Sequence, residues 1–279
     1  MTPTAAGSEI KPWTLSLLPP LPTIALRILE ELSKEDFATS RVVRWIEADP
    51  AFTAELLRVA NSAMYGASYQ IRSVQRAAMT LGADFVKALA ITVAMRIYLK
   101  TALRLPILRR CWRHSLACGI LAEELSLATW DDVGAGYTAG MLHDIGRLGF
   151  LATYPVEYAG LLGAPVEHSV DLLHRERELF KVDHCEAGEW LARKWKLPFE
   201  LEAIAARHHE EPDQNASTLN TVRLACRLAD ALGYSVIPGE SCDEYLSLTA
   251  RLSSEARARF PACYEDLKAK IVSRIDALN

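Results

Sequence analysis

The chain has 279 residues, of which 50% are hydrophobic and 24% are charged. This composition can bury a sizeable core and excludes a largely disordered protein. The net charge of −4 and the isoelectric point near 6.0 argue against a protein that holds nucleic acid through bulk positive charge.

The six cysteines form no C-x-x-C pair, so the sequence predicts neither a zinc ribbon nor a disulfide-exchange motif. Scattered cysteines in a chain of this length are typical of buried, reduced thiols in the cytoplasm. The longest apolar run, near residues 88–95, is much shorter than a membrane span, and residues 1–11 contain no apolar signal segment. We therefore expect a cytoplasmic protein without membrane contact.

Apolar residues recur at helical spacing along the chain, and the period-two alternation typical of strands is absent. Residues 1–14 are predicted to be a flexible leader, followed by an N-terminal helical subdomain at 15–105. Its predicted helices cover residues 23–33, 40–48, a segment beginning at Pro50, 73–81 and 84–99. Asp49 is the expected N-cap before Pro50, and Gly82 is the expected break between the last two helices.

A second helical block is predicted at residues 106–238, followed by a helical tail at 239–279. The predicted helices of the block cover residues 110–127, 137–151, 183–196, 199–210 and 219–232. Asp183 and Glu186 have the spacing of a capping box at the start of the third. In the tail, residues 243–253 and 264–278 are predicted to be amphipathic helices. The expected fold class is all-α.

Five of the seven histidines belong to an ordered series of metal-ligand types, and His168 and His174 are the two that do not. The series contains His114, His143, Asp144, His184, His208, His209 and Asp230. Each residue lies on or near the apolar side of a predicted helix, where an unpaired imidazole or carboxylate is costly. One such histidine alone is more often a hydrogen-bonded core residue. The whole series instead favours convergence on a divalent metal ion.

The order of this series resembles that of the HD superfamily of metal-dependent phosphohydrolases. The N-terminal half narrows the resemblance to the HDOD family (HD-related output domain). The motifs that carry it are Leu18-Pro19-Pro20-Leu21-Pro22, Asp49-Pro50, residues 56–66, residues 71–74 and Leu81-Gly82. The similarity runs from Leu15 to Tyr234. It implies a helical bundle in which the N-terminal subdomain packs on an HD-like helical core.

The resemblance also implies roles for the ligand series. His114, His143, Asp144 and Asp230 would hold a first metal ion. The other members, His184, His208 and His209, would hold a second, with Asp144 as the bridge. Mixed imidazole and carboxylate ligation suits iron, manganese or zinc. Two ions so held can generate hydroxide and clamp a phosphate.

Three departures separate this chain from the catalytic relatives. After His208-His209-Glu210 it lacks the Arg-Trp-Asp-Gly run and the Gly-Tyr-Pro signature of the HD-GYP phosphodiesterases. Arg147 stands where the enzymes usually carry lysine, and it would steady a substrate phosphate if the protein is an enzyme. Arg110 stands where trinuclear relatives place a glutamate ligand, so we expect no third ion. Arg110 and Arg113 fit a solvated basic face better than an anionic pocket.

We favour a regulatory function, because HDOD proteins are generally regarded as outputs of bacterial signal transduction, often attached to receiver domains. The N-terminal block has no receiver-like alternation of strands and helices. The expected partner is a signalling protein of unknown identity, bound at small apolar surfaces on the N-terminal helices.

Two other functions stay open. The first is a metal-dependent phosphohydrolase acting on a nucleotide or cyclic nucleotide, supported by the complete ligand series. The second is DNA binding, because residues 41–61 have the helix, short turn and helix of a helix-turn-helix. The basic residues of that segment are offset by Glu47, Asp49 and Glu55, which disfavours nucleic acid as a partner.

Overall fold

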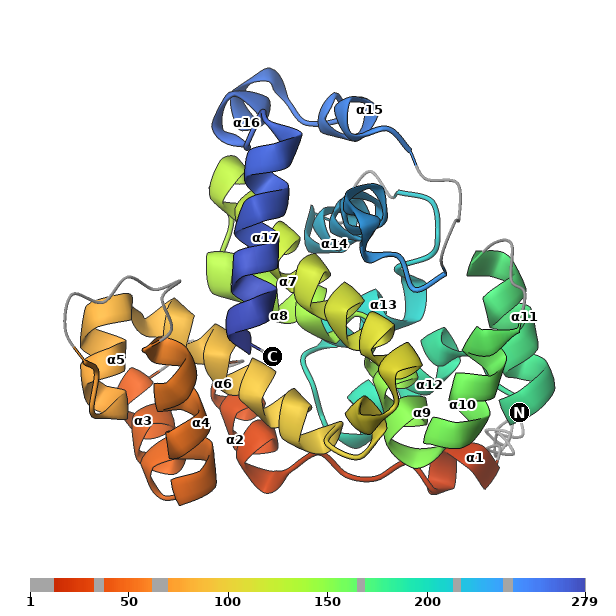
Figure 1. The fold of residues 1–279 in the computed structure, drawn as a ribbon, viewed down its shortest axis with the longest axis horizontal. Coiled ribbons are helices and arrows are strands. Elements are labelled where there is room, and N and C mark those ends of the chain that lie inside the picture. Colours follow the sequence, from red (N-terminus) through yellow and green to blue (C-terminus); the bar gives the residue numbers. More distant parts are fainter. Residues whose placement is uncertain are drawn as a thin grey trace, which may run out of the picture.

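The computed structural model describes residues 13–32, 38–61, 70–164, 169–212, 217–237 and 243–278, and every regular element in these ranges is a helix. The predicted all-α fold class is therefore confirmed. Figure 1 shows a bundle of short helices at one end, drawn in red and orange, joined through α6 to a larger helical body. None of the helices in the described ranges has the length and apolar character needed to cross a bilayer.

The N-terminal subdomain consists of short helices with buried apolar faces. They are α2 (Thr23–Leu32), α3 (Thr39–Glu47), α4 (Pro50–Ala60), α5 (Val74–Leu81) and α6 (Ala83–Tyr98). The predicted boundaries agree with these to within one residue. Gly82 separates α5 from α6 with a φ of 92°, a backbone conformation that glycine adopts far more readily than other residues.

Asp49 caps α4 as predicted. Its Oδ1 accepts a hydrogen bond from the Phe52 backbone N–H at 3.0 Å. We expect Asp49→Ala to lower the free energy of unfolding by about 1 kcal/mol, because an N–H of the first turn loses its acceptor. Urea unfolding followed by circular dichroism measures this change. Asp49→Ser retains an acceptor and serves as the control; an equal loss in both variants would contradict the capping role.

The second half contains the helices that carry the predicted ligands. They are α7 (Arg109–Thr129), α8 (Val133–Leu142), α9 (Ile145–Thr153), α10 (Pro155–Gly163), α11 (Ser169–Phe180), α12 (His184–Lys194), α13 (Phe199–Arg207) and α14 (Ser217–Ala229). Two 3-10 turns, Ala102–Arg104 and Pro106–Leu108, connect α6 to α7. Asp183 and Glu186 form the predicted capping box of α12.

The N-terminal end of the described chain packs against the second half. The predicted leader extends to Thr14, but Trp13–Ser16 form α1, and Thr14 is buried. Thr14 Oγ1 donates to the Phe180 carbonyl of α11, and the Tyr154 hydroxyl donates to the Thr14 carbonyl. Figure 1 shows α1 beside α9 and α10, away from α3 to α5. These bonds order the last two residues of the predicted leader, and its residues 1–12 lie outside the described ranges.

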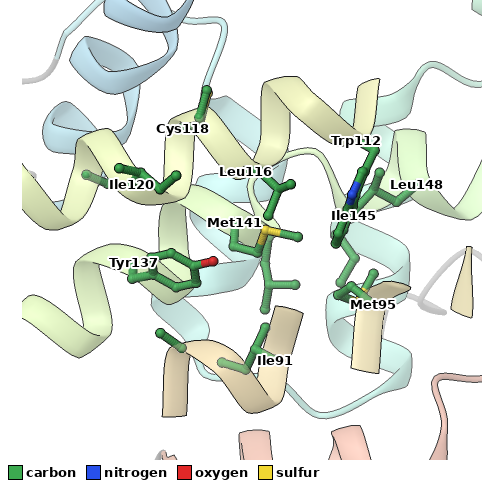
Figure 2. Close-up of a cluster of buried hydrophobic side chains, with 14 of the residues drawn as sticks. Ile91, Met95, Trp112, Leu116, Cys118, Ile120, Tyr137, Met141, Ile145 and Leu148 are labelled. Atoms are coloured by element: carbon green, nitrogen blue, oxygen red, sulfur yellow. The ribbon is translucent and has the colours of Figure 1, made fainter. Parts of the chain in front are cut away.

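One continuous core connects the two halves. In Figure 2, Ile91 and Met95 of α6 face Leu116 of α7 and Met141 of α8, and all four side chains are buried. Cys118 lies on the side of α7 opposite to Leu116, because residues two positions apart on a helix point in nearly opposite directions. Thus α6 anchors the N-terminal bundle, and α7 separates the apolar core from a polar region.

The predicted single helix over residues 137–151 is wrong. The structure has α8 and α9 there, and Asp144 between them has φ −92° and ψ 24°, outside the helical region. Every residue from 137 to 151 is buried, so apolar spacing does not mark the break. The bend places His143 and Asp144 in a turn instead of on a continuous helix face.

No helix was predicted between residues 152 and 182, but the structure has α10 and α11 there. The buried face of α11 is narrow: among its described side chains only Leu172, Glu176 and Phe180 are buried, and they are spaced four residues apart. A glutamate at a core position weakens the apolar periodicity on which the prediction relied. This omission matters because Glu176 contacts the candidate site.

The C-terminal tail is helical, but one of its two predicted helices is wrong. The predicted helix over residues 243–253 is interrupted: α15 (Tyr245–Thr249) ends early, and α16 (Ser254–Arg259) starts after its N-cap Ser253. The predicted helix over residues 264–278 is α17 (Tyr264–Leu278). Ion pairs from Lys270 and Arg274 to Glu124 and Glu123 attach α17 to α7.

Candidate metal centre

The structure brings the five histidines of the predicted series into one cluster. His114 lies on α7, His143 in the α8–α9 turn, His184 at the start of α12, and His208 and His209 directly after α13. The ring centroids of successive neighbours lie 5.4 Å (114–143), 4.9 Å (143–208), 4.4 Å (208–209) and 5.1 Å (209–184) apart. His174 is exposed on α11, and His168 lies outside the described ranges.

Two glycines allow the helices that carry these residues to approach closely. A Cβ added to Gly140 would lie 2.4 Å from the Cys118 carbonyl oxygen of α7. A Cβ added to Gly146 would lie 2.0 Å from the His184 carbonyl oxygen of α12. Side chains at these positions would push α8 from α7 and α9 from α12, so the site depends on backbone contact.

Asp144 lies at the centre of the cluster. Its Oδ1 is 3.3 Å from Nε2 of both His184 and His208, and its Oδ2 is 3.7 Å from His143 Nε2. The carboxylate therefore faces histidines from both predicted ligand sets. This placement agrees with the bridging position that the family resemblance implies.

Arg147 points into the cluster instead of toward solvent. Its side chain is buried, its Nε lies 2.9 Å from Asp144 Oδ2, and its Nη2 donates to His184 Nε2 at 3.0 Å. Arg147 lines the cavity, and its Nη1 atom is buried without a hydrogen-bond partner, while its Nε faces Asp144. Arg110 and Arg113 are exposed, as expected for a solvated basic face.

Glu176 is a residue of the site that the sequence analysis missed. It is fully buried, and its Oε2 accepts hydrogen bonds from His184 Nδ1 at 2.6 Å and from the His184 backbone N–H at 2.9 Å. Its Oε1 accepts a bond from the Tyr158 hydroxyl. A carboxylate in this position orients a ligand imidazole and raises its basicity. The sequence signal that could have identified it is the four-residue spacing of Leu172, Glu176 and Phe180, which places the glutamate on an apolar helix face.

Backbone carbonyls orient three of the other imidazoles. His114 Nδ1 lies 3.1 Å from the Tyr234 carbonyl oxygen, and His143 Nδ1 lies 2.7 Å from that of Gly140. His208 Nδ1 lies 3.1 Å from the Ala205 carbonyl oxygen. A carbonyl accepts only from a protonated nitrogen, so each ring donates through Nδ1. This leaves Nε2 as the free ligand atom, an arrangement typical of metal-binding histidines.

Two cysteines complete one side of the cluster. Cys118 on α7 places its Sγ 3.4 Å from His114 Nε2 and 3.7 Å from Cys226 Sγ of α14. From the sequence, the cysteines were expected to be buried, reduced thiols, and neither of these two was predicted to be a ligand. Their four-residue spacings to His114 and Asp230 were the signal that could have identified them.

Asp230 lies on the other side of the His114 ring. Its Oδ1 is 3.7 Å from His114 Nδ1, the nitrogen that donates to the Tyr234 carbonyl. The last predicted ligand of the first set is therefore near His114, but it does not face the nitrogen that is available for a metal ion.

The charged groups of the site shift one another's pKa values. Burial alone would raise the pKa of Asp144, but Arg147 and the neighbouring imidazoles hold it well below its usual range. Burial alone would lower the pKa of His143, but Cys226 and Asp144 outweigh it and raise the pKa to about 9. A hydrogen bond from Cys118, together with the imidazoles, keeps the pKa of the Cys226 thiol well below its usual value.

The donor atoms fit a divalent metal ion. Among the described residues, both carboxylate oxygens of Asp144 and Nε2 of His208 are buried without a well-directed hydrogen bond, which is costly unless an ion is bound. The ligand atoms lie within 4.8 Å of one another in each of three groups, which are His143/Asp144/His208, His114/Cys118/His143/Cys226 and His184/Cys185/His208/His209. A cavity of about 200 Å³ is lined by members of all three groups.

Comparison with known proteins places the chain in a family. The family model described as "HDOD domain" matches residues 18–211. A solved HDOD domain protein of unknown function from Geobacter sulfurreducens is 25% identical, with a TM-score of 0.70 over 94% of this chain and 91% of that chain.

Two curated relatives are much longer than this chain. An uncharacterized protein of Treponema pallidum is 26% identical over 214 residues, which are 75% of this chain and 41% of that protein. Ribonuclease Y of Thermus thermophilus is 34% identical over 176 residues, which are 62% of this chain and 24% of that enzyme. The matched family model and the helical fold together show that the chain belongs to the HDOD family.

Proposed function

We propose that the protein is a signal-transduction module that binds a metal ion in its HD-like half and acts through contacts with a partner protein. The observation that carries the proposal is the position of Arg147. Its guanidinium group contacts both Asp144 and His184, the two residues between which a second metal ion would lie.

A two-metal hydrolytic centre needs a carboxylate that bridges two cations and an open position for water. Here the positive charge of Arg147 already balances Asp144 from within the protein. A second ion beside His184 would have to displace a buried guanidinium group or lie against it, at a high electrostatic cost. This arrangement favours a scaffold that keeps the HD fold without two-metal catalysis.

The partner contact is expected on the N-terminal helices. Met79 on α5 is 78% exposed, in a groove that Val43 and Glu47 of α3 also line. Contiguous exposed apolar patches mark protein-contact surfaces, and we propose that Met79 and this groove belong to one.

A metal-dependent phosphohydrolase acting on a nucleotide or cyclic nucleotide is the second candidate. The oxygens of Asp144 favour it, because they face Arg147 without a well-directed hydrogen bond and could bind a metal ion. The similarity to ribonuclease Y also supports a phosphodiester substrate, although the chain spans only 24% of that enzyme.

A hydrolysis screen distinguishes the two candidates. The full chain would be loaded in turn with Mn²⁺, Fe²⁺ and Zn²⁺ and mixed with bis(4-nitrophenyl) phosphate, a cyclic dinucleotide or a short single-stranded RNA. We expect no rate above that of Asp144→Asn, because Arg147 occupies the second cation position. Metal-dependent turnover that disappears in both Asp144→Asn and His143→Ala would establish the enzyme instead.

A further inference from the structure

We propose that His114, Cys118, His143 and Cys226 form a closed, zinc-type metal site with two thiolate and two imidazole ligands. We call it the Cys2His2 site. The inference deepens the proposed function, because it names the donor atoms of the metal ion in the HD-like half. It differs from the ligand set implied by the family resemblance, in which Asp144 and Asp230 accompany the two histidines.

The measured spacings match a tetrahedral ion. Zinc bonds of about 2.3 Å to sulfur and 2.05 Å to nitrogen give, at tetrahedral angles, about 3.8 Å between two sulfurs and about 3.5 Å between sulfur and nitrogen. The structure has 3.7 Å between the Sγ atoms of Cys118 and Cys226, and 3.4 Å between Cys118 Sγ and His114 Nε2. All four donor atoms lie within 4.8 Å of one another.

The imidazoles are held in the orientation that such a site requires. His114 and His143 each donate through Nδ1 to a backbone carbonyl, of Tyr234 and Gly140 respectively. Their Nε2 atoms are therefore deprotonated and free to bind a metal ion when the rings are neutral. The fixed rings reduce the ordering cost of binding.

The geometry at Asp230 argues against the ligand set of the relatives. Asp230 approaches His114 at Nδ1, whereas Cys118 approaches it at Nε2. One ion therefore cannot use His114 Nε2 and also bind Asp230 without a rearrangement. The matched family model ends at residue 211, before α14, so Cys226 comes from a part of the chain beyond that match.

The surroundings suit a closed thiolate site. Cys118 points away from the apolar cluster of Figure 2 and is fully buried, and His143 and His114 are 2% and 7% exposed. Cys226 is half-buried and lines the cavity beside the site. Thiolate ligands select zinc over magnesium, calcium or manganese. Four protein ligands leave no coordination position for an activated water, which agrees with the proposed non-hydrolytic function.

Metal analysis of the natively purified full chain, with and without added Zn²⁺, is the first test. We expect about one equivalent of zinc per chain, since Arg147 opposes a second ion. Replacement by Co²⁺ should produce a thiolate-to-cobalt charge-transfer band in the unsubstituted protein. This spectrum reports sulfur ligation without relying on any variant that might not fold.

Substitutions then identify the ligands. Cys118→Ser and Cys226→Ser should each weaken zinc binding by at least about 10-fold. Loss of a residue that only hydrogen-bonds to a metal ligand already lowers metal affinity by about 10-fold or more, and loss of a ligand should cost at least as much. Cys111→Ser is the matched control, because Cys111 is an equally buried free thiol on α7 outside the cluster. Asp230→Asn should retain zinc.

Three results would overturn the inference. One is metal binding that survives both cysteine substitutions and is lost in Asp230→Asn, which would restore the ligand set of the relatives. The second is the absence of bound metal after loading. The third is four titratable thiols instead of the six in the sequence, in denatured, unreduced protein, with five in Cys118→Ser, which would show that Cys118 forms a disulfide. The first and third results leave the proposed function standing, because another of the three ligand groups could hold the ion, whereas the second would remove the metal ion from both proposals.

Discussion

Asp144→Ala is expected to lower the free energy of unfolding of the metal-free protein by about 3–5 kcal/mol, because it leaves the buried charge of Arg147 without its partner. The Arg147 side chain is only 5% exposed, and its Nε contacts Asp144 at 2.9 Å. Urea unfolding followed by tryptophan fluorescence and circular dichroism measures the loss. A loss below about 1 kcal/mol would show that this buried ion pair contributes no more to stability than an exposed pair does.

A double-substitution cycle separates the ion pair from the rest of the cluster. Arg147→Met should recover a large part of the lost stability when it is combined with Asp144→Ala, because the unpaired charge is then absent. Glu189→Ala is the control: it breaks the exposed pair between Glu189 and Arg193, for which we expect at most about 0.5 kcal/mol. Additive losses at Asp144 and Arg147 would contradict the direct pairing.

Gly146→Ala is expected to destabilise the protein by about 3 kcal/mol, because overpacking of a close backbone contact forces two helices apart. The added Cβ would lie 2.0 Å from the His184 carbonyl oxygen and 2.4 Å from the Gly188 nitrogen. Both are backbone atoms of α12, which cannot move aside as a flexible side chain can. The same displacement would separate Asp144 from His184, so metal binding should weaken together with stability.

Gly160→Ala provides the matched control. Gly160 lies within α10, and a Cβ there would meet nothing within 4 Å. This substitution should stabilise the protein by about 0.5–1 kcal/mol, because alanine loses less backbone entropy than glycine in a helix. Thermal unfolding of both variants and of the unsubstituted protein measures the expected loss of stability in Gly146→Ala and the expected gain in Gly160→Ala. Similar midpoints for both variants would exclude a steric role for Gly146.

The sequence by itself determined the helical class and most helix positions, because these depend on local periodicity and capping. Asp49 before Pro50 and Asp183 with Glu186 mark helix starts through contacts within four residues, and the structure has both caps. The order of the histidine series also predicted a cluster of five imidazoles. The sequence places each near the apolar side of a predicted helix, and such faces pack together in a helical bundle, although His143 lies in a turn and His208 and His209 follow α13.

The tertiary structure decided which atoms face one another. The contacts of Cys226 with Cys118 and of Glu176 with His184 join residues 108 and 8 positions apart on different helices, so no spacing within one helix predicts them. Arg147 could have faced solvent or a substrate; the bend at Asp144 directs it to the carboxylate. The physical reason is that periodicity specifies which face of a helix is buried, whereas close packing between helices selects the partner of each buried polar atom.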